Sequence, residues 1–391
     1  MREKLEQAAE LVRESGLDLW LTFDRETAEG GDPILPYLFD AGLTWHSALI
    51  VAANGERVAI VGNYDASPLE ESGNWTSIVP YVQSIREPLL ETLERLLGPN
   101  PRIGLNYSTS DVKCDGLSHG MYLTLCEYVK GTRFESAFES AEFILRNLRG
   151  VKTPSELLLI RDALKETDQM FDLIGRSARI GATEREIYDL VHTEARDKGL
   201  GFSWDPAGDP IVNCGPDSAV GHGLPSSTLK LAAGHILHVD LGLTKAGYSS
   251  DIQRCWYVGD SVPSEVNRAF AAVNAAITAG ANALRPGVKG WEVDAAGRQS
   301  IVESGYPEYL HALGHQVGRV AHDGGTILGP RWERYGNTPD GVVRANEVYT
   351  LELGVFVDGA GYVGLEEMVL VTETGCEFIS DRQTELWLLH P

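Results

Sequence analysis

Hydrophobic and polar positions follow two different periods along this chain. The opening run, MREKLEQAAELVRESGL, has the pattern of a charged amphipathic helix, expected over 2–15, with a strand over 17–23 behind it. Apolar segments on either side of Asn54-Gly55 then predict a β-hairpin with a two-residue turn. Two further helices and a strand are expected over 88–97, 120–128 and 102–107. Residues 1–148 are therefore predicted to form one α/β domain.

The pattern changes near residue 149. Thr153 and Thr183 are each followed three residues later by a glutamate, a capping-box pattern that predicts long helices over 154–178 and 184–198. Strands and helices then alternate, with strands over 211–213, 235–243 and 249–257, helices over 264–284 and 290–304, and strands over 347–357 and 361–371. Two helices followed by a hairpin thus occur twice, which indicates an internal duplication. Residues 149–391 are expected to form a curved antiparallel sheet covered by helices, so the predicted fold class is α+β.

Four acidic residues fall within the two hairpins of this second domain. In HVDLGLTKAGYSSD we place a two-residue turn at 245–246, so that Asp240 lies opposite Asp251. In YTLELGVFVDGAGYVGLEE a three-residue turn, Asp-Gly-Ala, puts Glu352 opposite Glu366. Cross-strand partners project from the same face, so each hairpin is expected to present a pair of carboxylates.

The strands that carry these acids are strongly apolar. Ile, Leu and Val residues surround Asp240 and Glu352, which is typical of strands buried on both faces. Solvated acids on exposed strands are the alternative, but these neighbours argue against it, and buried acids are rarely left unpaired. Four carboxylates in apolar surroundings repel one another unless they are protonated or hold cations. The pattern therefore favours a metal site.

Three histidines lie between the two hairpins, in the run HALGHQVGRVAH: His311, His315 and His322. One imidazole and four carboxylates suit a pair of divalent ions, and Mn²⁺, Co²⁺, Fe²⁺ and Zn²⁺ all accept such oxygen-rich ligands. Two ions about 3.5 Å apart acidify a bridging water and polarise a carbonyl group. The residues therefore predict a hydrolase with two divalent ions per chain.

Composition narrows the range of functions. The chain has 391 residues, 43% of them hydrophobic, and a formal net charge of -23, which argues against nucleic-acid binding because that needs basic patches. No apolar run of about 18 residues occurs, and the charged N-terminal helix is unlike a signal peptide, so no membrane contact is expected. The five cysteines form no CxxC pair, which predicts reduced thiols in a cytoplasmic protein.

From about residue 152 to residue 371, the chain resembles the creatinase / aminopeptidase P / prolidase / methionine aminopeptidase superfamily, whose catalytic domain has the pita-bread fold. DLGLTKAGYSSDIQR resembles the family pattern D-x-G-x(4)-G-Y-x-S-D-x-x-R, and HALGHQVGRVAHD resembles H-x-x-G-H-x-x-G-x-x-x-H-[DE]. LELGVF and LEEMVLVTETG resemble its two glutamate motifs. Residues 1–148 resemble the smaller N-terminal domain of the creatinase, aminopeptidase P and prolidase branch.

The resemblance implies a metal-binding role for five residues. Asp240 would bind one ion alone, and Asp251 and Glu366 would bridge both ions. His315 and Glu352 would complete the second ion, with Glu352 also shuttling a proton. Mn²⁺ is the first expectation for the metal, with Co²⁺, Zn²⁺ and Fe²⁺ as alternatives.

The resemblance also implies roles for three histidines that the residues alone place only as candidate acids or hydrogen-bond donors. His222, in AVGHGLP, matches a family histidine near the scissile bond. His322 matches one that binds the substrate and steadies the tetrahedral intermediate, and His311 matches one in the substrate pocket. We therefore expect His222 and His322 to serve catalysis and substrate binding, and His311 to serve substrate binding.

The sequence departs from the family pattern at three places. The family's arginine two positions before the last ligand is Gly364, and the proline after Glu352 is Leu353. In proline-specific members that arginine helps to organise the pocket. The segment 323–346 is longer than usual, and its Arg and aromatic residues either rim the pocket or form an ordinary surface loop.

The resemblance favours an Xaa-Pro peptidase, either a dipeptidase or an aminopeptidase P, in which a metal-bridging hydroxide attacks the bond between an N-terminal residue and proline in a short peptide. A related hydrolase of a small non-peptide amide or amidine, creatinase-like or ectoine-hydrolase-like, is the alternative, and Gly364 favours it slightly. A catalytically silent binding module is the third possibility, but no metal ligand is lost. Family members commonly form homodimers, so a homodimer is expected.

Overall fold

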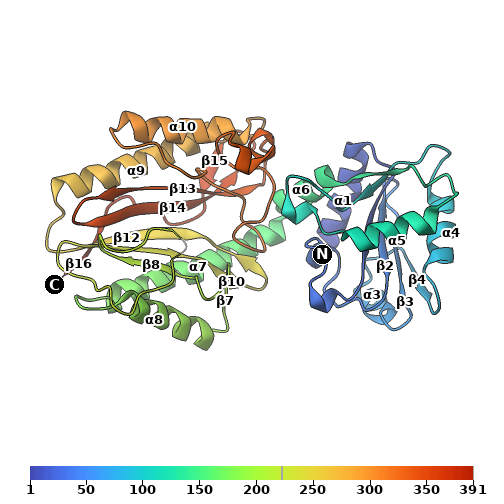
Figure 1. The fold of residues 1–391 in the computed structure, drawn as a ribbon, viewed down its shortest axis with the longest axis horizontal. Coiled ribbons are helices and arrows are strands. Elements are labelled where there is room, and N and C mark those ends of the chain that lie inside the picture. Colours follow the sequence, from blue (N-terminus) through green and yellow to red (C-terminus); the bar gives the residue numbers. More distant parts are fainter. Residues whose placement is uncertain (222, 391) are drawn as a thin grey trace. The chain divides into compact units, whose positions relative to one another are not determined.

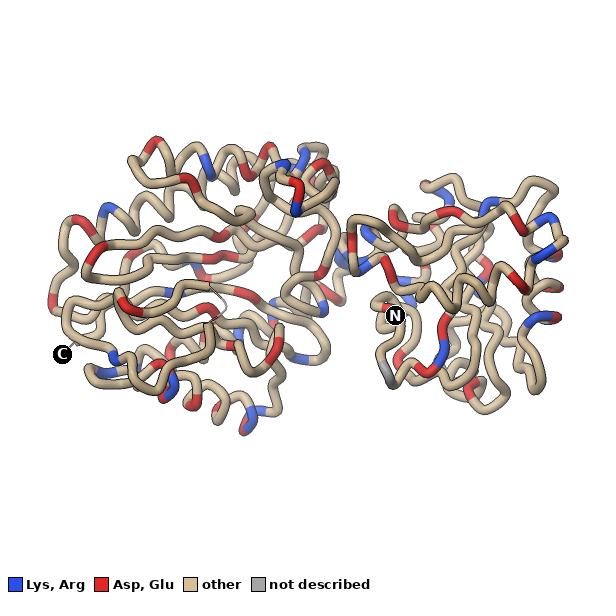
Figure 2. The backbone as a smooth tube through the Cα atoms, in the orientation of Figure 1, with Lys and Arg blue, Asp and Glu red and all other residues tan. Residues whose placement is uncertain are grey.

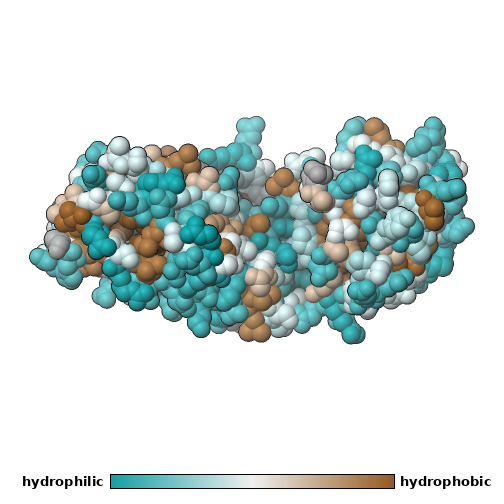
Figure 3. Space-filling view, turned by 90° about the horizontal axis from the view of Figure 1, so that it is seen from below, coloured by the Kyte–Doolittle hydropathy of each residue, from teal (hydrophilic) through white to brown (hydrophobic). Residues whose placement is uncertain are grey.

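The computed structural model describes residues 1–221 and 223–390, and the chain divides into two compact units, Met1–Arg149 and Gly150–Pro391 (Figure 1). All five cysteines lie in the described part and are free thiols, as expected. Among the described residues, no helix combines the length and the apolar character that crossing a membrane requires. The face drawn in Figure 3 is largely hydrophilic, with small hydrophobic patches scattered over it.

A mixed sheet with the strand order β4-β3-β2-β1-β5-β6 forms the centre of the N-terminal unit. Its strands are β1 (Leu19–Asp24), β2 (Ser47–Ala52), β3 (Arg57–Gly62), β4 (Ser77–Tyr81), β5 (Ile103–Leu105) and β6 (Phe138–Ser140). The helices are α1 (Arg2–Ser15), α2 (Leu35–Leu38), α3 (Ala66–Ser72), α4 (Arg86–Leu96), α5 (His119–Val129) and α6 (Glu142–Gly150). Alternation along β1 creates two cores, because Trp20 packs with α1 whereas Leu19 and Leu21 pack with α4 and α5. This arrangement is the predicted α/β domain.

The first hairpin was predicted correctly in its strands but not in its turn. The N–H of Ala52 donates to the carbonyl of Glu56, which leaves three residues, 53–55, in the turn between β2 and β3. Gly55 has a φ of 90°, a left-handed conformation that a three-residue hairpin turn needs at its last position. The Asn-Gly signal therefore located the turn but gave it one residue too few.

An antiparallel sheet with the order β13-β14-β12-β9-β8 forms the centre of the C-terminal unit, with β15 on β14, and β16 added in parallel to β12. The strands of this sheet are β8 (Ile211–Cys214), β9 (Ile236–Leu241), β12 (Ile252–Val258), β13 (Val348–Val357), β14 (Gly361–Val371), β15 (Cys376–Phe378) and β16 (Trp387–Leu389). A smaller sheet pairs β7 (Gly201–Phe202), β10 (Leu243–Lys245) and β11 (Tyr248–Ser249). The predicted strand over 249–257 is thus interrupted at 250–251.

Four long helices flank the main sheet: α7 (Pro154–Ser177), α8 (Glu184–Asp197), α9 (Ser264–Ala283) and α10 (Gly290–Glu303). The capping boxes predicted at Thr153 and Thr183 are both present, with the threonine hydroxyl and the glutamate carboxylate each accepting a backbone N–H. The order helix, helix, hairpin occurs twice along the unit, as predicted, and the arrangement confirms the pita-bread fold (Figure 1).

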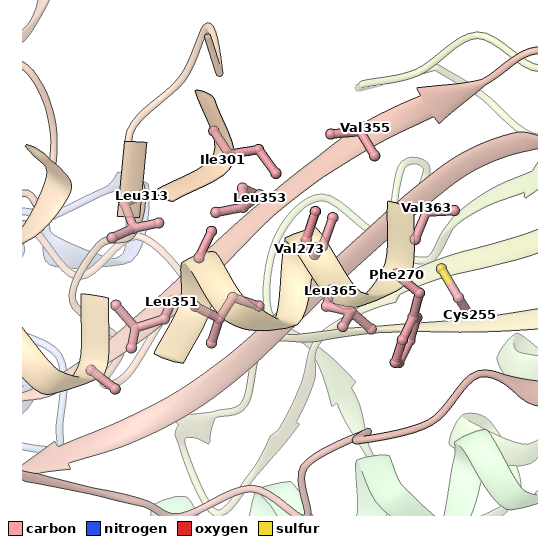
Figure 4. Packing of buried hydrophobic residues seen from close by; sticks show 14 of the residues in the cluster. Cys255, Phe270, Val273, Ile301, Leu313, Leu351, Leu353, Val355, Val363 and Leu365 are labelled. Carbon is pink, nitrogen blue, oxygen red and sulfur yellow. The ribbon is translucent and has the colours of Figure 1, made fainter. Parts of the chain in front are cut away.

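Helices cover one face of the main sheet and leave the other face to the acids. Leu351, Leu353 and Leu365 point toward α9 from alternate positions of β13 and β14 (Figure 4). On β9, Val239 and Leu241 pack in the core that α7 and α8 share. Side chains alternate along a strand, so the residues between these leucines and valines project from the opposite face. Each buried leucine contributes about 2 kcal/mol of hydrophobic stabilisation, so the helix-covered face fixes the orientation of the acidic one.

Candidate metal centre

One row of paired residues crosses four strands of the main sheet and carries three of the predicted ligands. Asp240 on β9 pairs with Gln253 on β12, and Gln253 pairs with Glu366 on β14. Glu366 in turn pairs with Glu352 on β13, as predicted. Directly paired residues share a face, so the four side chains converge. Figure 2 shows acidic positions on these central strands.

The prediction that Asp240 lies opposite Asp251 was wrong, because the turn begins one residue later than expected. Thr244 pairs with Ser249, and the turn residues are Ala246 and Gly247, with φ of 50° and 77°. A turn with two positive φ values matches the twist of hairpin strands. The register shifts by two residues as a result, and Gln253 takes the place opposite Asp240. A shift of two keeps the face, so Asp251 still projects toward the row.

Asp251, His315 and Glu366 form the tightest group of possible ligands in the described part of the chain. One ligand atom from each lies within 4.8 Å of the others. Nε2 of His315 lies 3.7 Å from Oδ2 of Asp251 and 3.8 Å from Oε1 of Glu366. It lies 3.5 Å from Oε1 of Glu352. The structure therefore gathers the predicted imidazole and the predicted glutamates around one point.

Backbone pairing with β13 holds His315 in this position. The N–H of Thr350 donates to the carbonyl of His315 at 2.9 Å, and the N–H of His315 donates to Oγ1 of Thr350 at 3.2 Å. A Cβ at the preceding Gly314 would lie 2.0 Å from the carbonyl oxygen of Thr350, so only glycine permits this approach. The glycine before the histidine in the GH motif thus has a steric role.

Burial raises the pKa of every acid in the cluster. It raises the pKa of Asp240 to about 7, and burial with the charge of Asp240 raises the pKa of Glu352 to about 8. For Asp251 and Glu366, burial and then the neighbouring carboxylates raise the pKa well above its usual range. Burial, followed by the nearby His322, lowers the pKa of His315 well below its usual value. A neutral imidazole is the form that ligates metals.

These residues fit a bound divalent cation. Oδ1 of Asp240 is buried and has no hydrogen-bond partner among the described residues, and a buried carboxylate oxygen in that state is costly unless a cation binds it. The donors are four carboxylates and one imidazole without a thiolate. That set suits Mn²⁺, Co²⁺, Fe²⁺ or Zn²⁺ better than a structural zinc.

The predicted histidines occupy different places. His322 is exposed, and its ring lies edge-on to His315 with the centroids 4.3 Å apart. His311 is also exposed, and its ring lies 5.6 Å from that of Tyr309. His222 lies outside the described residues. The structure therefore brings His322 to the acidic cluster and His311 to a neighbouring tyrosine.

Several polar residues beside the cluster were not predicted. Tyr309 and Tyr362 lie close enough to the acids that, after burial, the charge of Glu352 contributes to raising the pKa of each phenol. Gln253 donates directly to Glu352, and His238 reaches the glutamates through its contact with Gln253. The alternation along β14 could have indicated Tyr362, which lies four positions before Glu366, but Gln253 needed the correct hairpin register.

The long segment 323–346 contacts the backbone next to His311. Arg334 donates to the carbonyl of Leu310, and the N–H of Ala312 donates to the hydroxyl of Tyr335 at 3.0 Å. Arg331 stacks 4.2 Å from the ring centre of Trp291. The segment therefore supports the part of the chain that carries His311. This role lies between the two that were considered for the segment, a rim of the pocket and an ordinary surface loop.

Comparisons with known proteins agree with this geometry. Residues 159–373 match Metallopeptidase family M24. The Xaa-Pro dipeptidase of Pyrococcus furiosus is 29% identical over 273 residues, which cover 69% of this chain and 74% of that relative. The structure of dipeptidase PepE from Mycobacterium ulcerans is 24% identical, with a TM-score of 0.76 over 100% of this chain and 98% of that one. The structure of an Xaa-Pro dipeptidase from Bacillus anthracis is 25% identical, with a TM-score of 0.76 over 99% of both chains.

Proposed function

The chain belongs to metallopeptidase family M24, and from that premise we propose that it is a dinuclear-metal Xaa-Pro peptidase, which cleaves the bond between an N-terminal residue and proline in a short peptide. Membership of the family makes it a metal-dependent hydrolase. The relatives of dipeptidase type support the narrower substrate class. The observation that carries the proposal is the convergence of Asp251, His315 and Glu366 beside the row of Asp240 and Glu352.

We assign the five residues to two divalent ions, with Mn²⁺ as the first choice. Asp240 would hold one ion, His315 and Glu352 the other, and Asp251 and Glu366 both. Four carboxylates balance the charge of two divalent cations, which removes the repulsion that burial imposes on them. When bound, such a pair lowers the pKa of water and polarises a peptide carbonyl.

Exposure distinguishes Glu352 from the two acids assigned to both ions. The side chain of Glu352 is 20% exposed, compared with 6% for Asp251 and 2% for Glu366. Glu352 is therefore more accessible to a substrate than those two acids, and in the proposed reaction it passes a proton to the leaving nitrogen of the scissile bond. His322, exposed beside His315, donates a hydrogen bond to the carbonyl oxygen as negative charge develops there.

The test is hydrolysis by metal-stripped protein of Ala-Pro, Ala-Pro-Ala, Ala-Ala and creatine, with and without added Mn²⁺ or Co²⁺. We expect metal-dependent release of Ala from the proline peptides alone. The ratio of dipeptide to tripeptide rates separates a prolidase from an aminopeptidase P. Release of Ala from Ala-Ala at an equal rate would contradict proline specificity.

A protein that binds two metal ions per chain yet cleaves no peptide would overturn the peptidase proposal and direct the search to small amides and amidines. The homodimer that the family resemblance implies is part of the same proposal. Sedimentation velocity at micromolar protein concentration tests it, and a monomer of 42.6 kDa would contradict it.

A further inference from the structure

Gln253 is the one neutral residue in the row of Asp240, Gln253, Glu366 and Glu352. Its side-chain amide Nε2 donates to Oε2 of Glu352 at 3.1 Å and to Oε2 of Glu366 at 3.2 Å. The other oxygen of each glutamate, Oε1, faces His315. One amide group therefore fixes which oxygen each glutamate turns toward the imidazole. Its two N–H bonds donate to the Oε2 atoms, so the Oε1 atoms are left to face His315.

His238 fixes the orientation of that amide. Its Nε2 lies 2.9 Å from Oε1 of Gln253, and with its single proton on this nitrogen the neutral ring donates to that amide oxygen. An amide whose oxygen is held in this way must present its NH₂ group to the glutamates. His238 is itself buried and lies edge-on to Tyr362, and its Nδ1 is 2.9 Å from Oδ1 of Asn213. The amide nitrogen of Asn213 donates to the carbonyl of Ala219, which anchors the far end.

Gly364 leaves the space that this arrangement occupies. A Cβ at position 364 would lie 2.5 Å from Cε1 of Tyr362 and 2.8 Å from Nε2 of His238. It would lie 3.0 Å from Oε1 of Gln253. All three distances are shorter than ordinary van der Waals contact, so a side chain here displaces the His238–Gln253 pair. The arginine that the family pattern has at this position cannot coexist with the pair.

We propose that Gln253, oriented by His238, is a positioning residue for Glu352 and Glu366 as metal ligands, and that Gly364 is the substitution that admits it. The proposal rests on the proposed function, since it takes the two glutamates to be ligands. Hydrogen bonds to ligand carboxylates commonly change metal affinity by about 10–100-fold when they are removed.

The first experiment is calorimetric titration of the metal-stripped protein with Mn²⁺, comparing wild type with Gln253→Leu and Gln253→Met. We expect two ions per chain in the wild type, and an affinity about 10–100-fold lower in each variant for at least one ion. Gln253→Met nearly keeps the volume but loses the amide donor and adds no charge, so it separates hydrogen bonding from packing. Affinity equal to wild type in Gln253→Met would overturn the proposal.

His238 supplies a second test with a conservative rescue. His238→Leu leaves Oε1 of Gln253 without its donor and should weaken Mn²⁺ binding by about tenfold. His238→Gln restores an amide donor and should stay within about threefold of wild type. The visible absorption of the Co²⁺-loaded protein, which reports ligand geometry, should change in His238→Leu and return in His238→Gln. Equal affinities and spectra in the two variants would contradict an orienting role.

Gly364→Ala tests the steric part of the proposal, and Gly375→Ala is its control. A Cβ at Gly375 meets nothing within 4 Å, so Gly375→Ala should bind Mn²⁺ as the wild type does. Gly364→Ala should bind it at least tenfold more weakly while thermal unfolding shows a folded protein. The controls also separate the two proposals. Wild-type protein that binds no Mn²⁺ defeats the proposed function, whereas two tightly bound ions in wild type and in both Gln253 variants defeat only the positioning role.

Discussion

Each unit contains one cluster of buried polar residues, and the two clusters differ in whether their carboxylate oxygens have hydrogen-bond partners. In the N-terminal unit Asp32 is only 4% exposed, yet Oδ2 accepts from Nδ2 of Asn106 at 2.7 Å and Oδ1 accepts from the N–H of Ile34 at 3.0 Å. Asn106 also donates to Thr22, and its oxygen accepts from Trp20. In the metal centre, Oδ1 of Asp240 has no such partner in the described part of the chain.

The difference separates a structural acid from the acids proposed to bind metal. Burial raises the pKa of Asp32 to about 6 against the opposing effect of its hydrogen bonds, whereas it raises the pKa of Glu352 to about 8 and those of Asp251 and Glu366 well above their usual range. A satisfied acid holds a fold together, and acids that face one another store repulsion that a cation relieves. Burial of an acid alone therefore does not identify a functional site. What identifies it is whether the carboxylate oxygens lack hydrogen-bond partners and face other acids.

The largest effect is expected from Glu366→Gln in the metal centre. We expect kcat/KM on Ala-Pro to fall by at least about 10³-fold, which is about 4 kcal/mol of transition-state stabilisation, because an amide is a poor replacement for a carboxylate that, in the proposed function, would hold both ions. The stability of the metal-free protein should be unchanged or higher, because a carboxylate facing Asp251 becomes neutral. Steady-state kinetics and urea unfolding measure the two quantities.

The neighbouring acid provides a matched control. Glu367 projects from the opposite face and forms a buried ion pair with Arg254 at 3.1 Å, with both side chains 1% exposed. Glu367→Gln should lower the free energy of unfolding by about 3 kcal/mol, because Arg254 stays buried without its counter-charge. Mn²⁺ affinity should persist in the protein that remains folded. Equal losses of metal binding in the two variants would erase the distinction between functional and structural acids.

Asp32 offers a pH-dependent test of the satisfied cluster. Its pKa is raised to about 6 in the folded state from an ordinary value of 3.8, so between these pH values the folded state holds a proton that the unfolded state has lost. The contribution of Asp32 to stability therefore falls as pH rises through this window, by up to about 3 kcal/mol. Asp32→Asn removes this dependence. Hydrogen exchange of the amides of β1 and β5 from pH 4 to pH 7 measures it.

The comparison that matters is the difference in stability between wild type and Asp32→Asn at each pH, because other groups titrate in both proteins. That difference should decrease steadily between pH 4 and pH 6. The exposed Asp40→Asn is the matched control, and its difference from wild type should stay flat. A flat difference for Asp32→Asn as well would mean that hydrogen bonds offset the whole cost of burying the carboxylate.

Metal binding should stabilise one unit and not the other. A ligand present at 100 times its dissociation constant stabilises the folded state by about 2.7 kcal/mol. Mn²⁺ at that level should slow hydrogen exchange in β9, β12, β13 and β14, while β1 and β5 keep their rates. The Glu366→Gln variant should show no such slowing. Equal slowing in β1 would contradict an ion site confined to the C-terminal unit.

The two regions also differ in how far the sequence predicts them. The alternation of apolar and polar residues, together with the turn residues, predicted the strands of the metal centre. The alternation of side chains along a strand predicted which face of the sheet carries its acids. The predicted face was correct despite a wrong register, because the turn at Ala246-Gly247 shifts the register by two residues. A shift of two changes the residue opposite Asp240 but keeps the acids on the same face of the sheet. The partner itself, Gln253, depended on a turn that Lys245-Ala246-Gly247 allows at either of two positions.

The N-terminal cluster could not be predicted in the same way. Asp32 and Asn106 lie 74 positions apart, and neither belongs to a short motif. Their contact depends on the parallel pairing of β1 with β5 and on the path of the loop before α2, both of which are tertiary features. A metal centre leaves several acids in one pattern, whereas a satisfied hydrogen-bond network is built from ordinary residues that only the fold brings together.

The smallest expected effect comes from Trp20→Phe, which removes one donor from the satisfied cluster. Trp20 is 1% exposed, and its Nε1 donates to Oδ1 of Asn106 at 2.5 Å. Losing the indole leaves that oxygen buried without its donor and opens a small cavity, at a cost of about 1.5 kcal/mol. Trp45 is 57% exposed, so Trp45→Phe should change stability by less than about 0.5 kcal/mol. Urea unfolding gives both values, and Mn²⁺ affinity should be unchanged in both variants. Weaker Mn²⁺ binding in Trp20→Phe alone would show that the N-terminal cluster serves the metal centre as well as its own unit, and the contrast between the two regions would fail.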